Sequence, residues 1–298
     1  MDFESIIEGM RPREKSVLAV AAAEDDVVLG AVCQAADMGI VTPILCGNKD
    51  SIKAIAGEGG FDISGFEIVH CEDPISAAKT AVQLVKEKKA DILMKGLVQT
   101  ADLLRAVLNK ENGLRTDSVL SHTAILHAPS LGRPIILTDA AIIPYPDLPT
   151  KINMIKNAVK AALGIGIENP KVAILAAVEV VNPAMPATLD AAALALMNRR
   201  GQLKDCIVDG PLAFDLALSE EAVRHKKVVS EVAGKADILL LHNIEAANST
   251  LKAFTVVAGA LFGGIVMGAA APIVLTSRSD SEQSKLYSIA CAASIANQ

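Results

Sequence analysis

The chain has 298 residues, of which 51% are hydrophobic and only 3% aromatic, with no Trp. This length suggests two domains, and the excess of Ala, Val, Ile and Leu suits packed helices and buried parallel strands. Acidic residues outnumber basic ones by 34 to 28, and the formal net charge is −6. No basic block is available to cover a nucleic-acid backbone, so a nucleic-acid partner is not expected.

Short β-branched runs alternate with helical patterns along the whole chain. This alternation predicts βαβ units and a mainly parallel sheet, hence an α/β fold. In chain order we expect strand 17–20, helix 25–36, strand 42–45, helix 76–88, strand 92–94, helix 101–108, strand 135–137, helix 150–163, strand 172–175, helix 189–197, strand 207–208, helix 220–232, strand 238–241, helix 250–262, strand 273–275 and a C-terminal helix.

Segment 143–149 has three prolines in six residues, which fix φ and cannot continue a helix or a central strand. We therefore expect a domain crossing there. The first domain would comprise residues 1–143 plus about 270–298, and the second about 144–269.

Targeting and redox signals favour a cytoplasmic protein. The five cysteines include no Cys-x-x-C pair and no zinc-ligand spacing with His, so we expect reduced thiols and no metal site. The first fifteen residues show no secretion signal. The uncharged segment 256–275 is long enough for a membrane span, but Gly263, Gly264 and Pro272 interrupt it. We expect a helix followed by a β-rich run there, and no membrane partner.

Polar residues follow the expected strands, and in open α/β sheets ligands bind at the carboxyl ends of the strands. One such segment runs from Lys95-Gly96 into a helix whose N-terminus and adjacent Lys suit an anion such as phosphate. A simpler interpretation stays open, in which Thr100 is a helix cap and Lys95 a solvated loop residue, and Arg105 is equally able to pair with Asp102. The substrate-binding candidates at these strand ends are Lys95, Gly96, Thr100, Arg105, Asp139, Asn182, Glu245 and Asn248.

The strongest local candidate for chemistry follows the last strand. A guanidinium there can hold phosphate bidentately, and a hydroxyl can donate to developing negative charge. The segment 279–282 also fits the S-x-x-E capping box, so capping and catalysis both stay open for its two acids. The catalytic candidates are Ser277, Arg278, Asp280 and Glu282.

Other polar features have plainer explanations. Thr188 is expected to cap the helix after the loop 178–188. His122, His127 and His242 have no orienting partner evident from spacing and are expected to be structural. No G-x-G-x-x-G follows a strand, which argues against a dinucleotide-dependent oxidoreductase.

A family resemblance rests on six ordered segments, VAAAEDDVVLGAV, MKGLVQTADLLRAVL, TDAAIIPYPDL, EVVNPAMPATLDAAAL, DGPLAFDLALS and TSRSDSEQSKLYSIA. Over nearly its whole length the chain resembles the phosphate acetyl/butyryl transferase family, most closely its phosphate butyryltransferase branch. The resemblance implies two three-layer α/β/α domains around a cleft, as in isocitrate and isopropylmalate dehydrogenases, in a homodimer or higher homo-oligomer. It also implies that acyl-CoA, with butyryl-CoA favoured, and inorganic phosphate react to give acyl phosphate and CoA. CoA would be a substrate, and no cofactor would be needed.

The resemblance assigns Ser277 and Arg278 to a Ser-Arg pair that lines the site, and Arg105 to an arginine that meets phosphate. Two positions depart from the acetyl branch. Ser284 stands where that branch has an aspartate proposed as the base for the CoA thiol, and Ile143 stands where it has Asn. Either Asp280 or Glu282 substitutes for the base, or the thiolate arises otherwise.

We expect phosphate to attack the thioester directly in a ternary complex, with Ser277 stabilising the oxyanion or the thiolate. Because of Ser284 and Ile143, a second hypothesis is a relative that binds acyl-CoA or acyl phosphate, or regulates, without turnover.

Overall fold

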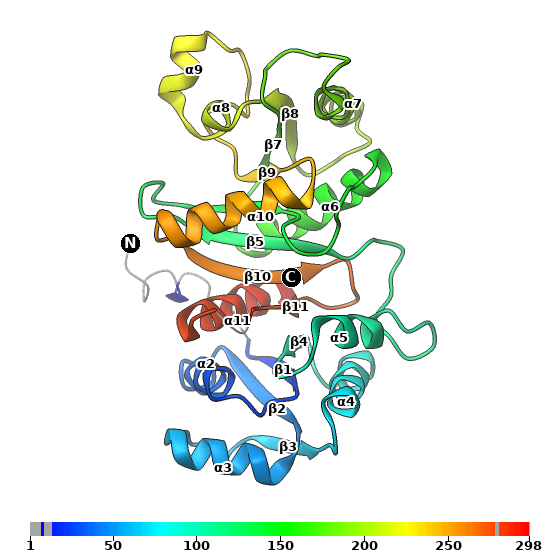
Figure 1. Ribbon diagram of the computed structural model, residues 1–298, viewed down its shortest axis with the longest axis vertical. Helices are drawn as coiled ribbons and strands as arrows, with labels where there is room; N and C mark the ends of the chain where they lie inside the picture. Colours follow the sequence, from blue (N-terminus) through cyan, green and yellow to red (C-terminus); the bar gives the residue numbers. More distant parts are fainter. Residues whose placement is uncertain (1–6, 9–13, 278–279, 298) are drawn as a thin grey trace. The chain divides into compact units, whose positions relative to one another are not determined.

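The computed structural model describes residues 7–8, 14–277 and 280–297. The chain divides into two compact units (Figure 1). Unit 1 comprises Met1–Ser118 and Leu261–Gln298, and unit 2 comprises Val119–Ala260.

The sheet of unit 1 has the strand order β3-β2-β1-β4-β11-β10. Its strands run parallel except β10, which is antiparallel to β11. Helices α2, α3 and α11 lie on one face of this sheet and α4 and α5 on the other (Figure 1). The bounds are β1 Ser16–Ala21, α2 Asp26–Asp37, β2 Val41–Gly47, α3 Lys49–Gly59, β3 Glu67–His70, α4 Pro74–Lys86, β4 Ile92–Lys95, α5 Thr100–Val107, β10 Leu261–Met267, β11 Ile273–Val274 and α11 Glu282–Ala296.

Because helices cover both faces of this sheet, its central strands are almost entirely buried. Every residue of β4 is buried, as is all of β1 except Val17. Such strands appear in the sequence as short continuous apolar runs rather than as alternating patterns. Side-chain caps begin four of these helices, because Asp25, Asn48, Asp73 and Ser281 each accept hydrogen bonds from backbone N–H groups of the first turn.

The sheet of unit 2 has the strand order β5-β6-β9-β7-β8, antiparallel between β5 and β6 and parallel elsewhere. Helices α6 and α7 lie on one face and α8, α9 and α10 on the other (Figure 1). The bounds are β5 Ser121–His127, β6 Pro134–Thr138, α6 Leu148–Gly164, β7 Lys171–Leu175, α7 Pro186–Arg199, β8 Ile207–Leu212, α8 Phe214–Leu218, α9 Glu220–Lys226, β9 Ile238–Leu240, α10 Ile244–Lys252 and the π-helical turn η1 Ala253–Val257.

The structure confirms the α/β class and all eight expected strands, but the expected helix 250–262 is wrong. Helix α10 ends at Lys252, and after η1 the chain enters β10, which contains Gly263 and Gly264. A Cβ on Gly263 would lie 3.1 Å from the ring of Tyr287 on α11. These glycines therefore do not break the element. Instead, Gly263 lets α11 pack closely on the strand.

The proline-rich segment 143–149, where we expected a domain crossing, connects β6 to α6 inside unit 2. The chain passes between the units at Ser118–Val119 and Ala260–Leu261 instead. The reason is that β5 and β6 form an antiparallel pair in the sheet of unit 2. The segment thus ends a strand and starts a helix of one unit. No helix in the described part of the chain combines the length and apolar character that crossing a membrane requires.

Candidate functional site

The carboxyl ends of three neighbouring strands bring two predicted segments together in unit 1. Strands β1 and β11 flank β4 in parallel, with Ala21 opposite Lys95 and Val274 opposite Met94. The chain that follows Val274 therefore leaves the sheet beside the chain that follows Lys95. This places Ser277 at the same edge as Lys95 and Gly96, which is where ligands bind in open α/β sheets.

Gly96 is required by a close approach of two backbones. Its N–H donates to Ala21 O at 2.8 Å, and the next N–H, of Leu97, donates to Ala22 O at 2.6 Å. A Cβ on Gly96 would lie 2.1 Å from Ala22 O, far inside contact distance. Gly96 thus fixes the path of the chain at this edge and is a structural member of the site.

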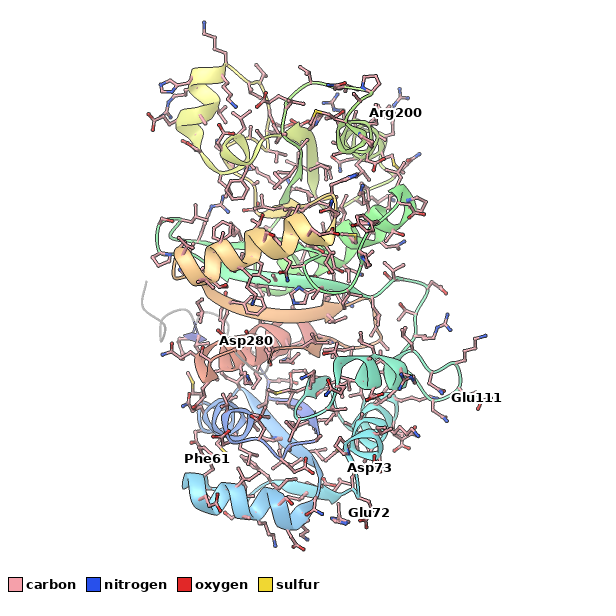
Figure 2. The ribbon with its side chains drawn as sticks, viewed as in Figure 1. Phe61, Glu72, Asp73, Glu111, Arg200 and Asp280 are labelled. Carbon is pink, nitrogen blue, oxygen red and sulfur yellow. The ribbon has the colours of Figure 1, made fainter. Side chains whose placement is uncertain are left out.

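Ser277 and Asp280 are hydrogen-bonded to each other at the centre of the candidate site, and this bonded pair is called the turn below (Figure 2 labels Asp280). The Asp280 carboxylate accepts a hydrogen bond from the Ser277 N–H at 2.6 Å, and the Asp280 N–H donates to Ser277 O at 3.2 Å. These two bonds link the catalytic candidates Ser277 and Asp280 directly. Arg278, the third candidate, lies outside the described residues.

Lys285 on α11 supports this turn and was not predicted from the sequence. Its side chain is buried, and its Nζ donates to Ser277 O at 3.1 Å and to Asp280 O at 2.8 Å. The available signal was a lysine one turn into a C-terminal helix whose later residues are mostly apolar. Lys95, 7% exposed, is a second buried ammonium group at the same edge, and its Nζ lies 3.2 Å from Gly96 O.

The expected capping box at 279–282 is wrong. The N-cap of α11 is Ser281, whose hydroxyl accepts from the Ser284 N–H at 3.2 Å, and Glu282 is the first helical residue. The Glu282 carboxylate accepts a hydrogen bond from Gln34 on α2 and packs against Gly30 of the same helix. It therefore joins α11 to α2, whereas Asp280 belongs to the turn with Ser277.

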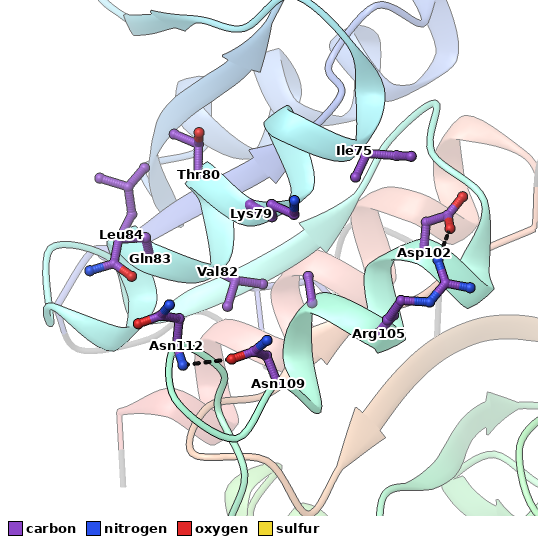
Figure 3. A pocket seen from close by; sticks show the side chains of 11 residues that line it. Ile75, Lys79, Thr80, Val82, Gln83, Leu84, Asp102, Arg105, Asn109 and Asn112 are labelled. Atoms are coloured by element: carbon purple, nitrogen blue, oxygen red, sulfur yellow. Dashed lines mark hydrogen bonds and ion pairs between the residues drawn. The ribbon is translucent and has the colours of Figure 1, made fainter.

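The helix after Lys95-Gly96 also differs from the simpler interpretation. Its N-cap is Gln99 without a side-chain bond, so Thr100 is the first helical residue and not a cap. Arg105 forms an ion pair with Asp102, as the sequence allowed. Both side chains line a cavity of about 700 Å³ between α4 and α5 (Figure 3).

In unit 2, Asp139 follows β6 and is 2% exposed. Its Oδ2 accepts from His122 N–H at 2.9 Å, and its Oδ1 accepts from the N–H groups of Ala141 and Ile142 at 2.8 and 2.9 Å. Three backbone donors occupy most of the acceptor capacity of one carboxylate. The contacts of Asp139 therefore fix the loop that begins at this strand end.

The same loop is tied to α10 by two further candidates. Asn248 donates from Nδ2 to Ala140 O at 3.0 Å, and Glu245 accepts a hydrogen bond from the hydroxyl of Tyr145. Tyr145 could not be identified from the sequence as the partner of Glu245, because the two residues are 100 positions apart.

The last candidate, Asn182, folds its own loop. Asn182 Oδ1 accepts from Ala184 N–H at 3.0 Å, and its N–H donates to Thr188 Oγ1 at 2.9 Å. Thr188 therefore does not cap α7, whose N-cap is Met185. Instead its hydroxyl secures the loop 182–188, because it also donates to carbonyl oxygens within that loop.

His242, expected to be structural and unpartnered, belongs to a charged cluster at the carboxyl end of β9. Lys151, 1% exposed, donates from Nζ to Asp190 Oδ2 at 2.6 Å and to His242 Nδ1 at 3.0 Å. An ammonium group can only donate, so Nδ1 is the acceptor and Nε2 carries the proton. Burial first, and then the Lys151 charge, lower the pKa of His242, while Asp190 opposes them. This imidazole is neutral at pH 7.

Cysteine chemistry does not contribute a nucleophile. All five cysteines are buried free thiols. Burial raises the pKa of Cys33 and Cys206 to about 11 and that of Cys46 and Cys291 to about 12. Thiols with such values are protonated at neutral pH and unreactive. Among the residues that the structure describes, no three His, Cys, Asp or Glu side chains group as a metal site.

Comparison with known proteins decides the family. The family described as phosphate acetyl/butaryl transferase matches residues 2–77 and 72–293. The chain belongs to this family. Among curated relatives of this phosphate acyltransferase, it is 52% identical to the phosphate butyryltransferase of Clostridium acetobutylicum, covering 99% of this chain and 98% of that protein. It is 43% identical to the phosphate acetyltransferase of Thermotoga maritima, covering 98% and 99%.

A solved structure extends the match to the fold. The branched-chain phosphotransacylase from Enterococcus faecalis V583 is 34% identical and has a TM-score of 0.83, with 94% of this chain and 99% of that chain covered. Its likeness supports the two α/β/α domains that the family resemblance implied for this member of the phosphate acetyl/butaryl transferase family.

Proposed function

We propose that this phosphate acyltransferase converts butyryl-CoA, or a similar short-chain acyl-CoA, and inorganic phosphate into acyl phosphate and CoA. The chain-length preference is supported by the phosphate butyryltransferase at 52% identity, compared with 43% for the phosphate acetyltransferase. One methylene group in a pocket changes binding by only about 1 to 3 kcal/mol, so the preference is graded rather than absolute.

The observation that carries the proposal is the turn of Ser277 and Asp280 beside Lys95 at one sheet edge. Acyl transfer between a thioester and phosphate develops negative charge on the carbonyl oxygen and then on the departing sulfur. Preorganised donors and cations that face this charge lower the barrier without a covalent intermediate. The turn supplies a hydroxyl group, and the strand end beside it supplies an ammonium group.

Our mechanism is a direct transfer in a ternary complex. A phosphate oxygen attacks the thioester carbon, the tetrahedral oxyanion forms, and the C–S bond breaks with its electron pair going to the CoA sulfur. Ser277 donates to the oxyanion or to the thiolate, and Arg278 and Arg105 hold the phosphate. For proton transfer with the thiol we favour Asp280 over Glu282, because Asp280 contacts Ser277 whereas Glu282 contacts α2.

In unit 2, the roles of Asp139, Asn182, Glu245 and Asn248 follow from their contacts. We propose that they shape the substrate-facing loops after β6 and β7. Each of the four holds loop backbone or a neighbouring side chain in the structure.

We further propose a cytoplasmic homo-oligomer with CoA as a substrate and no resident cofactor. The buried free thiols support a reducing compartment. Exposed apolar side chains on unit 2 support self-association, since Val256 and Val257 are 77% and 84% exposed. They adjoin a groove of about 320 Å³ lined by Phe214 and Phe254. Light scattering measures the oligomeric state, and Val256→Ser with Val257→Ser is expected to shift it toward monomer.

The deciding experiment incubates the protein with butyryl-CoA and phosphate and follows free CoA with a thiol reagent. We expect phosphate-dependent release that falls about 10²- to 10³-fold in Ser277→Ala and in Arg278→Ala. Acetyl- and branched acyl-CoA complete a panel that ranks chain length. Binding of acyl-CoA without release from any of them would favour the non-catalytic relative, which finds no support among the relatives above. A stable acyl-enzyme trapped after denaturation would contradict the direct transfer.

A further inference from the structure

Lys285 has the unusual surroundings of a buried cation without a carboxylate partner. The residue is 3% exposed, and both of its hydrogen bonds go to backbone carbonyl oxygens, those of Ser277 and Asp280. No ion pair joins its Nζ to an acidic side chain within the described residues. The Asp280 carboxylate, which is in the same turn, instead accepts from the Ser277 amide at 2.6 Å.

The other charged and titratable groups around Lys285 do not neutralise it. Glu282 is on its own helix but contacts Gln34 on α2. Among the elements packed against α11, α2 brings the carboxylates of Asp26 and Asp37 and the protonated thiol of Cys33, β4 brings a second ammonium group at Lys95, and β10 and β11 bring no titratable side chain. None of the carboxylates described on these elements forms an ion pair with Lys285, so its charge is held by the two carbonyl oxygens.

Burying an ammonium group without a counter-charge is costly, and carbonyl dipoles offset only part of that cost. The cost falls when an anion binds at the turn that Lys285 supports. In the proposed reaction such anions are the phosphate and the CoA thiolate. Ser284, one residue before Lys285, has a hydroxyl group that cannot accept a thiol proton at neutral pH, so its position supplies no base.

We propose that Lys285 is a positioning residue for acyl transfer, which fixes the Ser277–Asp280 turn and supplies the permanent positive charge that keeps the CoA sulfur in its thiolate form. This inference rests on the proposed function and deepens it. In the direction of acyl-CoA synthesis, the CoA thiol gives its proton to Asp280 or to water. The sulfur then forms a bond to the acyl carbon of acyl phosphate, the carbon–oxygen bond to phosphate breaks, and phosphate leaves with the electron pair. Cationic neighbours are known to favour thiolates in this way.

The test compares wild type, Lys285→Met and Lys285→Arg in both directions over a range of pH. Lys285→Met keeps the length of the side chain and removes its charge, while Lys285→Arg keeps the charge. The matched control is Lys86→Met, because Lys86 also donates to a backbone carbonyl oxygen, that of Glu111, but lies on α4 away from the turn. Thermal melting reports whether each variant is folded.

For Lys285→Met we expect kcat to fall about 10²-fold with little change in the KM for acyl phosphate. The acid limb of the pH profile for kcat/KM of CoA moves to higher pH, since the thiol loses its stabilising cation. Lys285→Arg restores the position of that limb, and Lys86→Met matches wild type. A folded Lys285→Met with wild-type rates would overturn the proposal, as would equal losses in both variants with an unchanged profile, which would show a merely structural role.

A second measurement does not depend on turnover. Ultraviolet difference absorbance follows the thiolate of CoA bound to the wild-type protein during a pH titration. We expect the bound thiol to ionise at lower pH than free CoA, and equal ionisation would overturn the proposal. Wild-type protein that converts no substrate in either direction would refute the proposed function instead, and comparing the titration of CoA bound to wild type with that of CoA bound to Lys285→Met would still decide the role of Lys285.

Discussion

Replacing Gly96 by Ala adds one methyl group at the point where the candidate site is most tightly packed. The added Cβ would lie 2.1 Å from Ala22 O and 2.8 Å from Ala21 O, and both oxygens belong to backbone that cannot rotate away. Overpacking of this kind costs about 1 to 3 kcal/mol. The backbone must move to make room for the methyl group. This movement also strains the two hydrogen bonds that Gly96 and Leu97 donate to these carbonyls, each contributing about 0.5 to 1.5 kcal/mol. We therefore expect the free energy of unfolding to fall by roughly 2 to 6 kcal/mol.

Urea denaturation of wild type and Gly96→Ala measures this loss, and phosphate-dependent CoA release shows its effect on the site. The matched control is Gly57→Ala, because Gly57 lies inside α3 and a Cβ there meets nothing within 4 Å. Alanine in a helix interior is expected to stabilise the chain by about 0.5 to 1 kcal/mol. Equal stability of Gly96→Ala and wild type would refute the argument that two backbones require glycine at this position.

Three further predictions concern charged side chains. Asp280→Asn is expected to lower kcat about 10²-fold, while Glu282→Gln leaves kcat little changed and affects mainly stability; comparable losses of activity in both would contradict the placement of Glu282 against α2. Asp139→Asn replaces a carboxylate that accepts three backbone N–H groups, and hydrogen bonds to charged groups contribute about 1.5 to 3 kcal/mol each, so its denaturation midpoint should fall clearly. The lowered pKa of His242 means that the unfolded chain binds the proton more readily, so stability is fully present above the ordinary pKa of 6.5 and is lost as pH falls below it. Melting temperatures of wild type and His242→Gln, measured from about one pH unit above that pKa to about 1.5 units below it, should show a steeper acid loss in wild type, and parallel curves would contradict this.

The local hydrophobic pattern of the sequence was sufficient to predict eight of the strands, because buried parallel strands appear as short apolar runs. The same pattern failed where pairing with a neighbouring strand decides the conformation. Strands β3, β5 and β10 were not expected, and β10 contains two glycines that a local pattern treats as a break. Antiparallel pairing with β11 places both glycines in a strand, and the close approach of Tyr287 explains why glycine stands at position 263.

The sequence by itself determined the α/β class, the family and the edge of the sheet at which the candidate residues gather, because these depend on residue type and order along the chain. Tertiary structure alone decided which candidates meet. It joined Ser277 to Asp280, turned Glu282 toward α2, and paired Lys151 with both Asp190 and His242. Such contacts depend on the register of strands and on the faces of helices, which bring together side chains that lie far apart in the chain. Burial, which governs whether a lysine such as Lys285 is an ordinary surface charge or a fixed cation beneath a turn, is likewise a property of the folded chain alone.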